Sequence, residues 1–522
     1  MKPHRQPTRH RLARTLVIAA FACGLLGITG SVEAGTATET DVMAWLDDVS
    51  PAITIDRSTN CMPGATPTAT QSTDAVAYRN DRIVIRSGAS DPIVAGIVNF
   101  KLDTMYSTPG HIYVGPIERI TFPTPPGGAA ITPVLSVTLL PRPGGLQHQI
   151  VTLARRLRSE SGQVSAPDYA YTPSGPYSYY WPYGYPQKTS TLTTPRGNFV
   201  PGTSDKIGST VKVEVYDTGL AALNPTDLPT TTKLSSADDE QANIVNNGPK
   251  MVDYPHAYHG TAIAGVLTTI APGMTIQEVR VNDRSGLLTD VSAARGMASS
   301  LRTLALADYP DVLVNAFGSA ACNVDPNVVG GPDLRPVGLE AVVEVVDKFD
   351  PKLSQGMVIV ASAGNVASTR PHYPAAFESV VSVGALDGTV DPDGDPWTSK
   401  SRTAPLADFT NRGSWVKFYA TGVDIPTTHA KGLRFETGGD IIDGRATVSG
   451  SSYSGPQFAG LIAEVMSTSK IKARAAVDAL RSSATAPLPQ CGGTTVESGK
   501  AVVLRELGAT STDPAQESPV TC

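Results

Sequence analysis

Three side chains with the chemistry of acyl transfer stand far apart in the sequence. Asp217 ends a short apolar run, His259 opens a helix pattern rich in small residues, and Ser452 opens another helix pattern. A serine hydroxyl attacks a carbonyl carbon when an imidazole takes its proton and a carboxylate orients and stabilises that imidazole. Each residue alone also fits an ordinary turn or helix cap. Together, in this order, they predict nucleophilic catalysis by the serine.

The elements that carry these residues explain how each would act. A carboxylate at the C-terminal end of a parallel strand, such as Asp217, lies where open α/β sheets bind their ligands. The positive end of a helix dipole favours a neutral, basic imidazole at His259. A serine at a helix start, such as Ser452, presents its own backbone N–H to a developing oxyanion. We therefore expect His259 and Ser452 to be exposed at their helix starts.

Apolar strand-like runs alternate with helix-period segments from residue 211 onward. We expect strands over 211–216, 276–281, 312–317, 357–363, 380–386 and 416–420, and helices over 261–267, 291–307, 336–349, 453–466 and 471–482. Apolar strands separated by helices require a sheet that is buried on both sides. The pattern predicts an α/β fold, with a mostly parallel sheet covered by helices on both faces.

A smaller unit precedes this region. Strand-like runs occur at 82–85 and 93–98, and a clearer strand at 135–140. The apolar positions 146, 150, 153 and 157 repeat along one face of a helix, and a strand-like run follows at 164–171. These segments predict a β-α-β unit, and with it a small α+β domain.

Four short motifs accompany the three residues. They read Asp-Thr-Gly at 217–219, His-Gly-Thr at 259–261, Ala-Ser-Ala-Gly-Asn at 361–365, and Gly-Ser-Ser at 450–452 with Pro456 after it. These motifs, in the chain order Asp, His, Ser, resemble the subtilisin-like serine proteases, the subtilase family (peptidase family S8). The resemblance covers roughly residues 207–508. It implies a subtilisin-like fold and a serine endopeptidase that works through a Ser-His-Asp triad and an acyl-enzyme.

The resemblance also implies roles for individual residues. Ser452 is similar to the family's nucleophile, His259 to its general base, and Asp217 to the carboxylate that orients the base. Asn365 is similar to the side-chain donor of the oxyanion hole. The positions that resemble the peptide-binding strands and the first specificity pocket are Ser285, Gly286, Leu287, Ala316, Phe317, Gly318, Ala361, Ser362, Ala363, Gly364 and His372. A peptide held between two strand edges gains affinity from main-chain hydrogen bonds.

The sequence departs from the family's pattern next to the triad and in a calcium loop. Ala262 follows the histidine motif in place of His, Ser451 replaces Thr, and Tyr453 replaces Met. Ala-Pro-Gly at 271–273 follows the histidine helix at once, so the familiar calcium loop is missing. The acidic turn at 391–395 does not fit an EF-hand, because its glycine is misplaced. We expect no cofactor, and no recognisable loop supports a structural calcium ion.

The first 34 residues have the pattern of an export signal. Basic residues precede an uncharged apolar run at 16–28, and small residues at 32 and 34 suit a signal peptidase. That run is shorter than the roughly 20 residues needed to cross a bilayer, so we expect a secreted, extracellular protein without a membrane span. The net charge of −6 offers no basic surface to nucleic acid.

Cysteine usage agrees with export. Cys61, Cys322, Cys491 and Cys522 remain after the signal is removed, and four cysteines allow three pairings. Two disulfides are expected. If Cys491 joins Cys522 near the C-terminus, then Cys61 joins Cys322. A zinc site is the alternative, although no Cys-x-x-Cys spacing supports it.

These observations divide the chain into five expected parts. They are a signal peptide (1–34), an N-terminal region with a propeptide-like α+β domain (35–172), a Pro/Tyr-rich linker (173–206), a subtilase catalytic domain (207–508) and a tail (509–522). The resemblance implies peptide or protein substrates and an N-terminal propeptide that acts as an intramolecular inhibitor, with 164–171 lying in the cleft. The alternatives are a catalytically silent binding or scaffold protein on the subtilase fold, and a processing protease of narrow specificity.

Overall fold

The computed structural model of the chain describes sixteen stretches. They are residues 53–56, 61, 76–125, 128–171, 187–188, 206–220, 233–236, 258–282, 287–305, 308–322, 334–353, 356–386, 406–428, 445–483, 486–487 and 500–501. The expected signal peptide and tail lie outside the described residues, as does nearly all of the linker. Ser285, Gly286, Cys491 and Cys522 also lie outside them.

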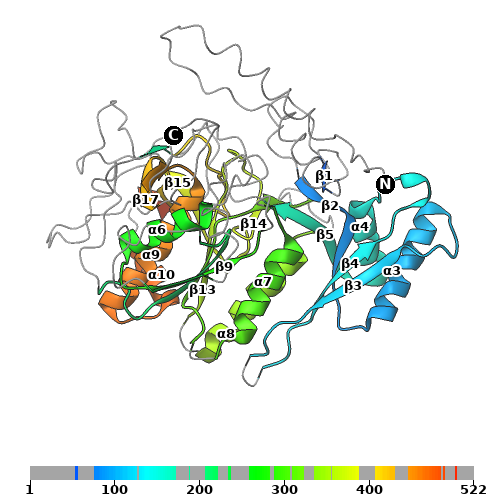
Figure 1. The fold of residues 1–522 in the computed structure, drawn as a ribbon, viewed down its shortest axis with the longest axis horizontal. Coiled ribbons are helices and arrows are strands. Elements are labelled where there is room, and N and C mark those ends of the chain that lie inside the picture. The colour runs from blue at the N-terminus through cyan, green and yellow to red at the C-terminus, as the bar shows by residue number, and fades with distance from the viewer. Residues whose placement is uncertain are drawn as a thin grey trace, which may run out of the picture. The chain divides into compact units, whose positions relative to one another are not determined.

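A mostly parallel sheet forms the centre of the region after residue 206 (Figure 1). Its strand order is β19-β20-β16-β15-β13-β11-β7-β9-β8. Neighbouring strands run parallel throughout, except for β19 and β20. The strands are β7 (Lys212–Asp217), β8 (Lys233–Ser236), β9 (Thr275–Arg280), β11 (Val312–Asn315), β13 (Val358–Ser362), β15 (Val381–Leu386), β16 (Phe418–Thr421), β19 (Ala486–Pro487) and β20 (Lys500–Ala501).

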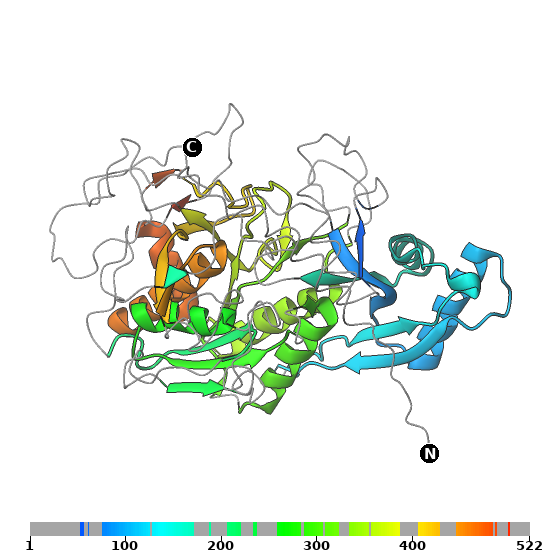
Figure 2. The ribbon, with the colours of Figure 1, turned by 45° about the horizontal axis from the view of Figure 1, so that its top comes forward.

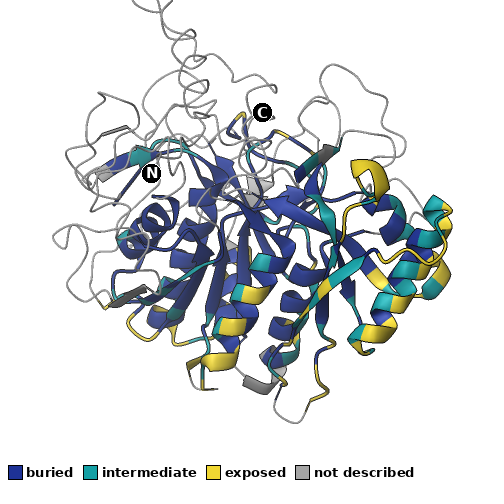
Figure 3. Cartoon of the chain, turned by 45° about the vertical axis from the view of Figure 1, so that its right-hand side comes forward, coloured by how far each residue is buried: buried dark blue, intermediate teal, exposed yellow. Residues whose placement is uncertain are grey.

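Helices cover both faces of this sheet. One face packs against α6 (His259–Ile270), α9 (Ser451–Ser469) and α10 (Ala473–Ser483), and the other against α7 (Asp290–Thr303) and α8 (Val337–Leu353). The alternation along β11 shows why: Val312 and Val314 pack with α6 and α9, whereas Leu313 packs with α7 and α8. Figure 3 shows these strands buried along their length. The predicted α/β fold is confirmed, because strands buried on both faces need apolar side chains at successive positions.

The expected elements of this region are confirmed with small shifts of their ends. The six predicted strands correspond to β7, β9, β11, β13, β15 and β16, and the five predicted helices to α6 to α10. Two small sheets were not predicted: β12 (Ser319–Ala320) pairs with β14 (His372–Tyr373), and β17 (Ile425–Thr428) pairs with β18 (Arg445–Val448), which pairs with β6 (Gln187–Lys188). No helix among the described residues is long and apolar enough to cross a membrane.

The N-terminal region is an antiparallel α+β unit, as predicted. Its central strand, β2 (Val76–Arg86), lies between β4 (Val134–Leu139) and β5 (Val164–Tyr171) and runs antiparallel to both. The connection from β4 to β5 carries helix α4 (Ile150–Ser161). This arrangement is the expected β-α-β unit with a further strand inserted. The elements are β1 (Ile53–Asp56), β2 (Val76–Arg86), α3 (Asp91–Tyr106), β3 (Val114–Ile120), β4 (Val134–Leu139), a 3-10 turn η2 (Pro143–Gly145), α4 (Ile150–Ser161) and β5 (Val164–Tyr171).

One expectation for this region is wrong. The run 93–98 is not a strand, because it lies within α3, which starts with Asp91 and a proline in its first turn. Proline suits a first turn and acids favour the helix N-terminus. Val94, Val98 and Leu102 are buried at a spacing of four, and exposed apolar residues between them gave the run its strand-like appearance. In addition, Leu146 is 60% exposed and precedes α4, so the amphipathic helix is shorter than the pattern suggested.

The N-terminal sheet contacts the region after residue 206 on one face and at one edge (Figure 2). Its helices α3 and α4 contact the sheet, and so do α7 and α8 of the region after residue 206. At the edge, β10 (Leu288–Thr289) pairs antiparallel with the end of β5, where Leu288 faces Tyr171. One continuous hydrophobic core therefore includes both the N-terminal sheet and these two helices.

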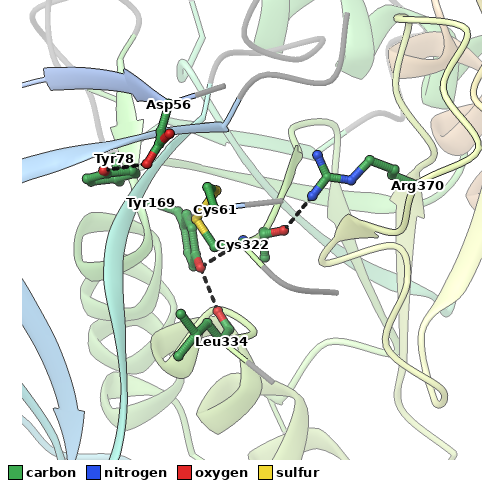
Figure 4. The surroundings of a disulfide bond; sticks show 8 residues. Asp56, Cys61, Tyr78, Tyr169, Cys322, Leu334 and Arg370 are labelled. Atoms are coloured by element: carbon green, nitrogen blue, oxygen red, sulfur yellow. Dashed lines mark hydrogen bonds between the residues drawn. A yellow bond between two sulfur atoms is a disulfide. The ribbon is translucent and has the colours of Figure 1, made fainter. Parts of the chain in front are cut away.

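A disulfide joins the two regions (Figure 4). Cys61, which follows β1, is bonded to Cys322, which follows β12, and both are fully buried. Beside this bond, the Tyr169 hydroxyl donates to the Leu334 carbonyl at 2.7 Å and accepts from the Cys322 N–H at 3.1 Å. The Cys61–Cys322 pairing is one of those that the sequence left open.

Candidate active site

Asp217 and His259 meet at the C-terminal edge of the parallel sheet. Asp217 is the last residue of β7 and His259 is the first of α6. His259 Nδ1 lies 2.8 Å from Asp217 Oδ1, and the same oxygen accepts the backbone N–H of Thr218 at 2.8 Å. Both side chains are only 1% exposed. A hydrogen bond from Nδ1 to a carboxylate fixes the tautomer, so Nε2 is the ring nitrogen that can accept a proton.

The glycines next to these residues let the two segments approach closely. A Cβ on Gly260 would lie 2.6 Å from the Gly219 carbonyl oxygen, so no larger residue fits without a shift. The Gly260 N–H donates to Thr218 Oγ1 at 2.9 Å, which ties the start of α6 to the turn after β7. The Asp-Thr-Gly and His-Gly-Thr motifs are therefore the two sides of one contact.

Ser452 lies in the first turn of α9, which follows Gly450. Gly450 has a φ of +149°, a conformation that favours glycine. The Ser452 hydroxyl donates to the Ala316 carbonyl at 3.2 Å, directly after β11. The next residue, Tyr453, has its ring centroid 5.6 Å from that of His259. The serine is thereby placed between the end of β11 and the start of α6.

Asn365 lies against the start of α9. Its Oδ1 accepts the Ser451 N–H at 2.8 Å, and the Ser451 hydroxyl accepts the Gly364 N–H at 2.9 Å. A Cβ on Gly450 would lie 3.1 Å from Asn365 Nδ2, so the amide nitrogen is on the glycine side of this turn. These contacts fix the loop after β13 to the helix that carries Ser452.

The expectation that the two helix starts would be exposed is wrong for this full-length chain. His259 is 1% exposed and Ser452 is 0% exposed. The contacts at the two helix starts explain this: the imidazole bonds to Asp217 and lies beside the Tyr453 ring, and the Ser452 hydroxyl bonds to the Ala316 carbonyl. The two helices also enclose the buried ring of Tyr453 beside the imidazole.

The residues expected to bind a peptide gather around the end of β5. Leu287 directly precedes β10, which pairs with β5. On the other side, the Phe317 ring lies 5.8 Å from the Tyr171 ring, measured between centroids. The Ala316 carbonyl accepts the Ser452 hydroxyl, as described above. A Cβ on Gly318 would lie 3.1 Å from the Tyr373 carbonyl oxygen. The last residues of β5 therefore lie between two of the expected substrate-binding segments.

The remaining expected pocket residues follow β13. Ala361, Ser362, Ala363 and Gly364 are buried, and Gly364 has a φ of +104°. A Cβ on Gly364 would lie 3.1 Å from His372 Nδ1. His372 is 2% exposed and stacks on Trp415 with an interplanar angle of 5°. Burial lowers the pKa of His372 to about 3, so this ring is neutral.

Sequence reasoning missed one buried acid beside the site. Glu278 of β9 is 1% exposed, and burial raises its pKa well above the ordinary value, with a further rise caused by Asp217. The signal was present in the pattern: Ile276 and Glu278 alternate as the buried positions of β9, and an acid at such a position is unusual. Tyr258 was missed as well, and burial and Asp217 also raise its pKa.

No metal-binding cluster accompanies these residues. Within the described stretches, no group of three or more His, Cys, Asp and Glu side chains is arranged to hold a metal ion.

The parallel sheet with helices on both faces defines an α/β protein, and a carboxylate–imidazole pair and the serine at the start of α9 lie at the C-terminal ends of its strands. The sequence profile of the subtilase family matches residues 208–509, which is more than half of the chain. The chain belongs to the subtilase family of serine peptidases.

Individual relatives are more distant. A thermophilic serine proteinase from Bacillus sp. (strain AK1) is 28% identical over 321 residues, which cover 59% of this chain and 64% of that protein, slightly less than two thirds. Subtilisin DY from Bacillus licheniformis is 26% identical over 273 residues, covering 50% of this chain and 78% of that protein. Fervidolysin from Fervidobacterium pennivorans, described as a keratinolytic enzyme related to subtilisin, has a crystal structure that aligns with a TM-score of 0.48 and 16% identity, covering 82% of this chain and 60% of that one.

Proposed function

We propose that this protein is a secreted serine endopeptidase whose catalytic triad is Ser452, His259 and Asp217. The observation that carries the proposal is the buried hydrogen bond between His259 Nδ1 and Asp217 Oδ1 at 2.8 Å, beside the helix turn that holds Ser452. A carboxylate in this position orients the imidazole and stabilises its protonated form. Membership of the subtilase family supports the same reaction.

The proposed reaction is that of a Ser-His-Asp triad. Ser452 Oγ attacks the peptide carbonyl while His259 Nε2 takes the hydroxyl proton, and the imidazolium then gives that proton to the leaving amine. The Ser452 N–H and Asn365 Nδ2 donate to the oxyanion of the tetrahedral intermediate. Water then attacks the acyl-enzyme by the same route. Loss of one oxyanion donor, as known from a subtilisin, lowers kcat on the order of 10²–10³-fold.

The peptide would be held as an added strand. In this proposal Leu287 lies on one side of the substrate, and Ala316, Phe317 and Gly318 lie on the other. The support is that β5 already uses this position, since it pairs with β10 and its terminal Tyr171 packs on Phe317. Main-chain pairing gives affinity that is independent of sequence, and pockets add selectivity.

The same contacts support an inhibitory role for the N-terminal region. We propose that 35–172 is a propeptide, that 173–206 is the linker in which the chain cuts itself, and that 207–508 is the catalytic domain. Because β5 occupies the edge that a substrate needs, the full-length chain would be a zymogen. The burial of Ser452 in this chain is consistent with that state. N-terminal sequencing of the secreted protein tests both the signal peptide 1–34 and the internal cut.

Covalent labelling tests the nucleophile. A fluorophosphonate should label the processed wild-type protein and fail to label Ser452→Ala, which should also accumulate uncut. Ser454→Ala is the matched control, because this buried serine lies in the same helix and its hydroxyl donates to the Thr421 carbonyl. Labelling that survives in Ser452→Ala, or a wild-type protein that never reacts, would favour a silent binding or scaffold protein. A peptide-library cleavage profile separates a general endopeptidase from a processing protease of narrow specificity.

A further inference from the structure

Glu278 is a buried acid on the same side of the sheet as the triad carboxylate. In the parallel pairing of β7 with β9, Glu278 is the partner of Val215, and Asp217 lies two residues further along β7. Side chains two residues apart on a strand point to the same face. Glu278 and Asp217 therefore form a diagonal pair on the face that α6 covers.

The Glu278 carboxyl group lies beside two glycines, Gly260 and Gly219. A Cβ on Gly260 would lie 3.1 Å from Glu278 Oε2 and 3.2 Å from the Gly219 backbone nitrogen. The carboxyl group thus reaches the contact between the turn after Asp217 and the start of the helix that begins with His259. Because β9 and β11 lie on opposite sides of β7, Glu278 and the bond of Ser452 to Ala316 are on opposite sides of the strand that carries Asp217.

Both acids have oxygens that accept nothing from the described residues. Glu278 Oε1 and Oε2 and Asp217 Oδ2 are buried and have no hydrogen-bond partner there, whereas Asp217 Oδ1 accepts two hydrogen bonds. A buried carboxylate without a donor or a cation is costly, whereas a neutral carboxyl is tolerated and brings its own O–H donor. Asp217 Oδ2 is an acceptor without a donor among the described residues, and Asp217 is the charged group that raises the pKa of Glu278.

The ionisable groups around Glu278 favour the neutral form. On its side of the sheet the charge that acts on it is that of Asp217 of β7, and its carboxyl group reaches Gly260, the residue after His259. Arg280, two residues along β9, donates to the Asn282 carbonyl. The charged residues of α7 are on the opposite face, where Glu214 bonds to Ser300 and to Tyr216. The side chains of β8 are outside the described set.

We propose that Glu278 is a positioning residue, a carboxyl group kept un-ionised whose O–H donates a hydrogen bond to Asp217 Oδ2. In this arrangement Glu278 adds no second negative charge beside Asp217, and its hydrogen bond holds the Asp217 carboxylate in the plane that the imidazole requires. The inference rests on the proposed function for its kinetic consequences. Its structural statement, that Glu278 is protonated near neutral pH, does not depend on catalysis.

An infrared measurement tests the protonation without any activity. The full-length Ser452→Ala chain should show the carbonyl stretch of a protonated carboxyl group at pH 8, and this band should be lost when Glu278→Gln is added. Glu214→Gln is the control, because it removes another buried acid of the same sheet. The band that is lost in Glu278→Gln must still be present in Glu214→Gln. A Glu278 difference spectrum that shows only an ionised carboxylate at pH 8 overturns the proposal.

Kinetics of the processed enzyme test the positioning role. Glu278→Gln keeps a neutral donor and should retain kcat within about threefold, whereas Glu278→Leu removes the donor at similar volume and should lower kcat about tenfold, with KM unchanged. Glu214→Gln should leave kcat and the acidic limb of the pH–rate profile unchanged, because it lies across the sheet. Two results would overturn the role of the donor. One is an equal kcat for Glu278→Leu and Glu278→Gln, and the other is a lower kcat/KM in both variants that comes from a higher KM. If fluorophosphonate labelling is absent in the wild type, the proposed function fails while the infrared result still stands.

Discussion

The sheet of the N-terminal region (53–171) and the parallel sheet of the catalytic region, the part of the chain after residue 206, are covered in different ways. The parallel sheet has its own helices on both faces, whereas the N-terminal sheet has α3 and α4 on one face and contacts α7 and α8 of the catalytic region with the other. All large apolar side chains that are exposed among the described residues belong to the N-terminal region: Ile93, Phe100, Ile112, Leu140, Leu146 and Val164. A sheet whose second face is covered by helices of another region depends on that region to stay folded.

The polar contacts between the regions show that the dependence is mutual. Asp168 of β5 accepts the Val291 N–H at 3.0 Å and thus caps α7. Asp290, the first residue of α7, accepts the N–H groups of Gly338 and Leu339 at 2.7 and 2.8 Å and caps α8. Carboxylates at helix N-termini satisfy free N–H groups and complement the helix dipole. The N-terminal region therefore caps α7, whose own first residue in turn caps α8.

The disulfide gives the sharpest test of this comparison. After self-cleavage within 173–206, the N-terminal fragment should remain joined to the catalytic region through Cys61–Cys322. All of it should migrate with the enzyme on a non-reducing gel and separate on a reducing gel. Because both sulfurs are buried, release should need either a second cut between residues 61 and 171 or full reduction. A free N-terminal fragment without reducing agent, appearing after a single cut in the linker, would contradict the prediction.

The same substitution in a helix of each region should have opposite effects. Gly260→Ala places a Cβ 2.6 Å from the Gly219 carbonyl and should displace His259 from Asp217, lowering kcat/KM at least 100-fold. Gly96→Ala in α3 meets no atom within 4 Å and should stabilise the N-terminal region by about 0.5–1 kcal/mol, since alanine favours helix. Peptide hydrolysis measures the first change and thermal unfolding the second. A fully active Gly260→Ala enzyme would argue against the tight contact between the two motifs.

Sequence patterns predicted the parallel sheet better than the N-terminal region, and the packing explains the difference. Strands such as 358–362 are buried on both faces and flanked by long amphipathic helices, so composition and period agree. In α3, the exposed residues Ile93 and Phe100 break the contrast between a buried and a polar face, and the run was interpreted as a strand. Local pattern carries little information where exposed positions are apolar, as they are in α3.

At the proposed site, the motifs predicted a carboxylate and an imidazole at element ends, and the structure brings Asp217 and His259 together. The burial of Ser452 and the position of Glu278 depend on how distant segments pack, through the contact of Ser452 with Ala316 and through the register of β7 with β9. Such long-range distances are fixed by tertiary structure alone.

A single hydroxyl in the interface should have an intermediate effect. Tyr169→Phe removes the donor to the Leu334 carbonyl and the acceptor for the Cys322 N–H, leaving both buried groups unpaired. Docking of the N-terminal fragment in a linker-cut Cys322→Ala protein should weaken about 10–100-fold, on the basis of about 1–3 kcal/mol for unpaired buried groups. Tyr113→Phe is the matched control, because that buried hydroxyl contacts Thr108 within the N-terminal region. Equal inhibition constants for the two variants would show that the Tyr169 contacts do not hold the interface.

Proton uptake should give the smallest effect, a pH-dependent affinity between the two regions. Burial raises the pKa of Asp290 from 3.8 to about 7, and burial also raises the pKa of Asp168. Undocking removes the cover of β5 from the start of α7, so the Asp290 carboxyl should return toward its ordinary, lower pKa. The docked state therefore binds the proton more tightly, and docking is favoured at low pH and weakens as the pH rises toward and past 7. For one proton, the dissociation constant should rise up to about tenfold between pH 6 and 8. Titration of the linker-cut Cys322→Ala protein at both pH values measures it, and tighter docking at pH 8 would mean that both carboxylates are ionised in the docked state.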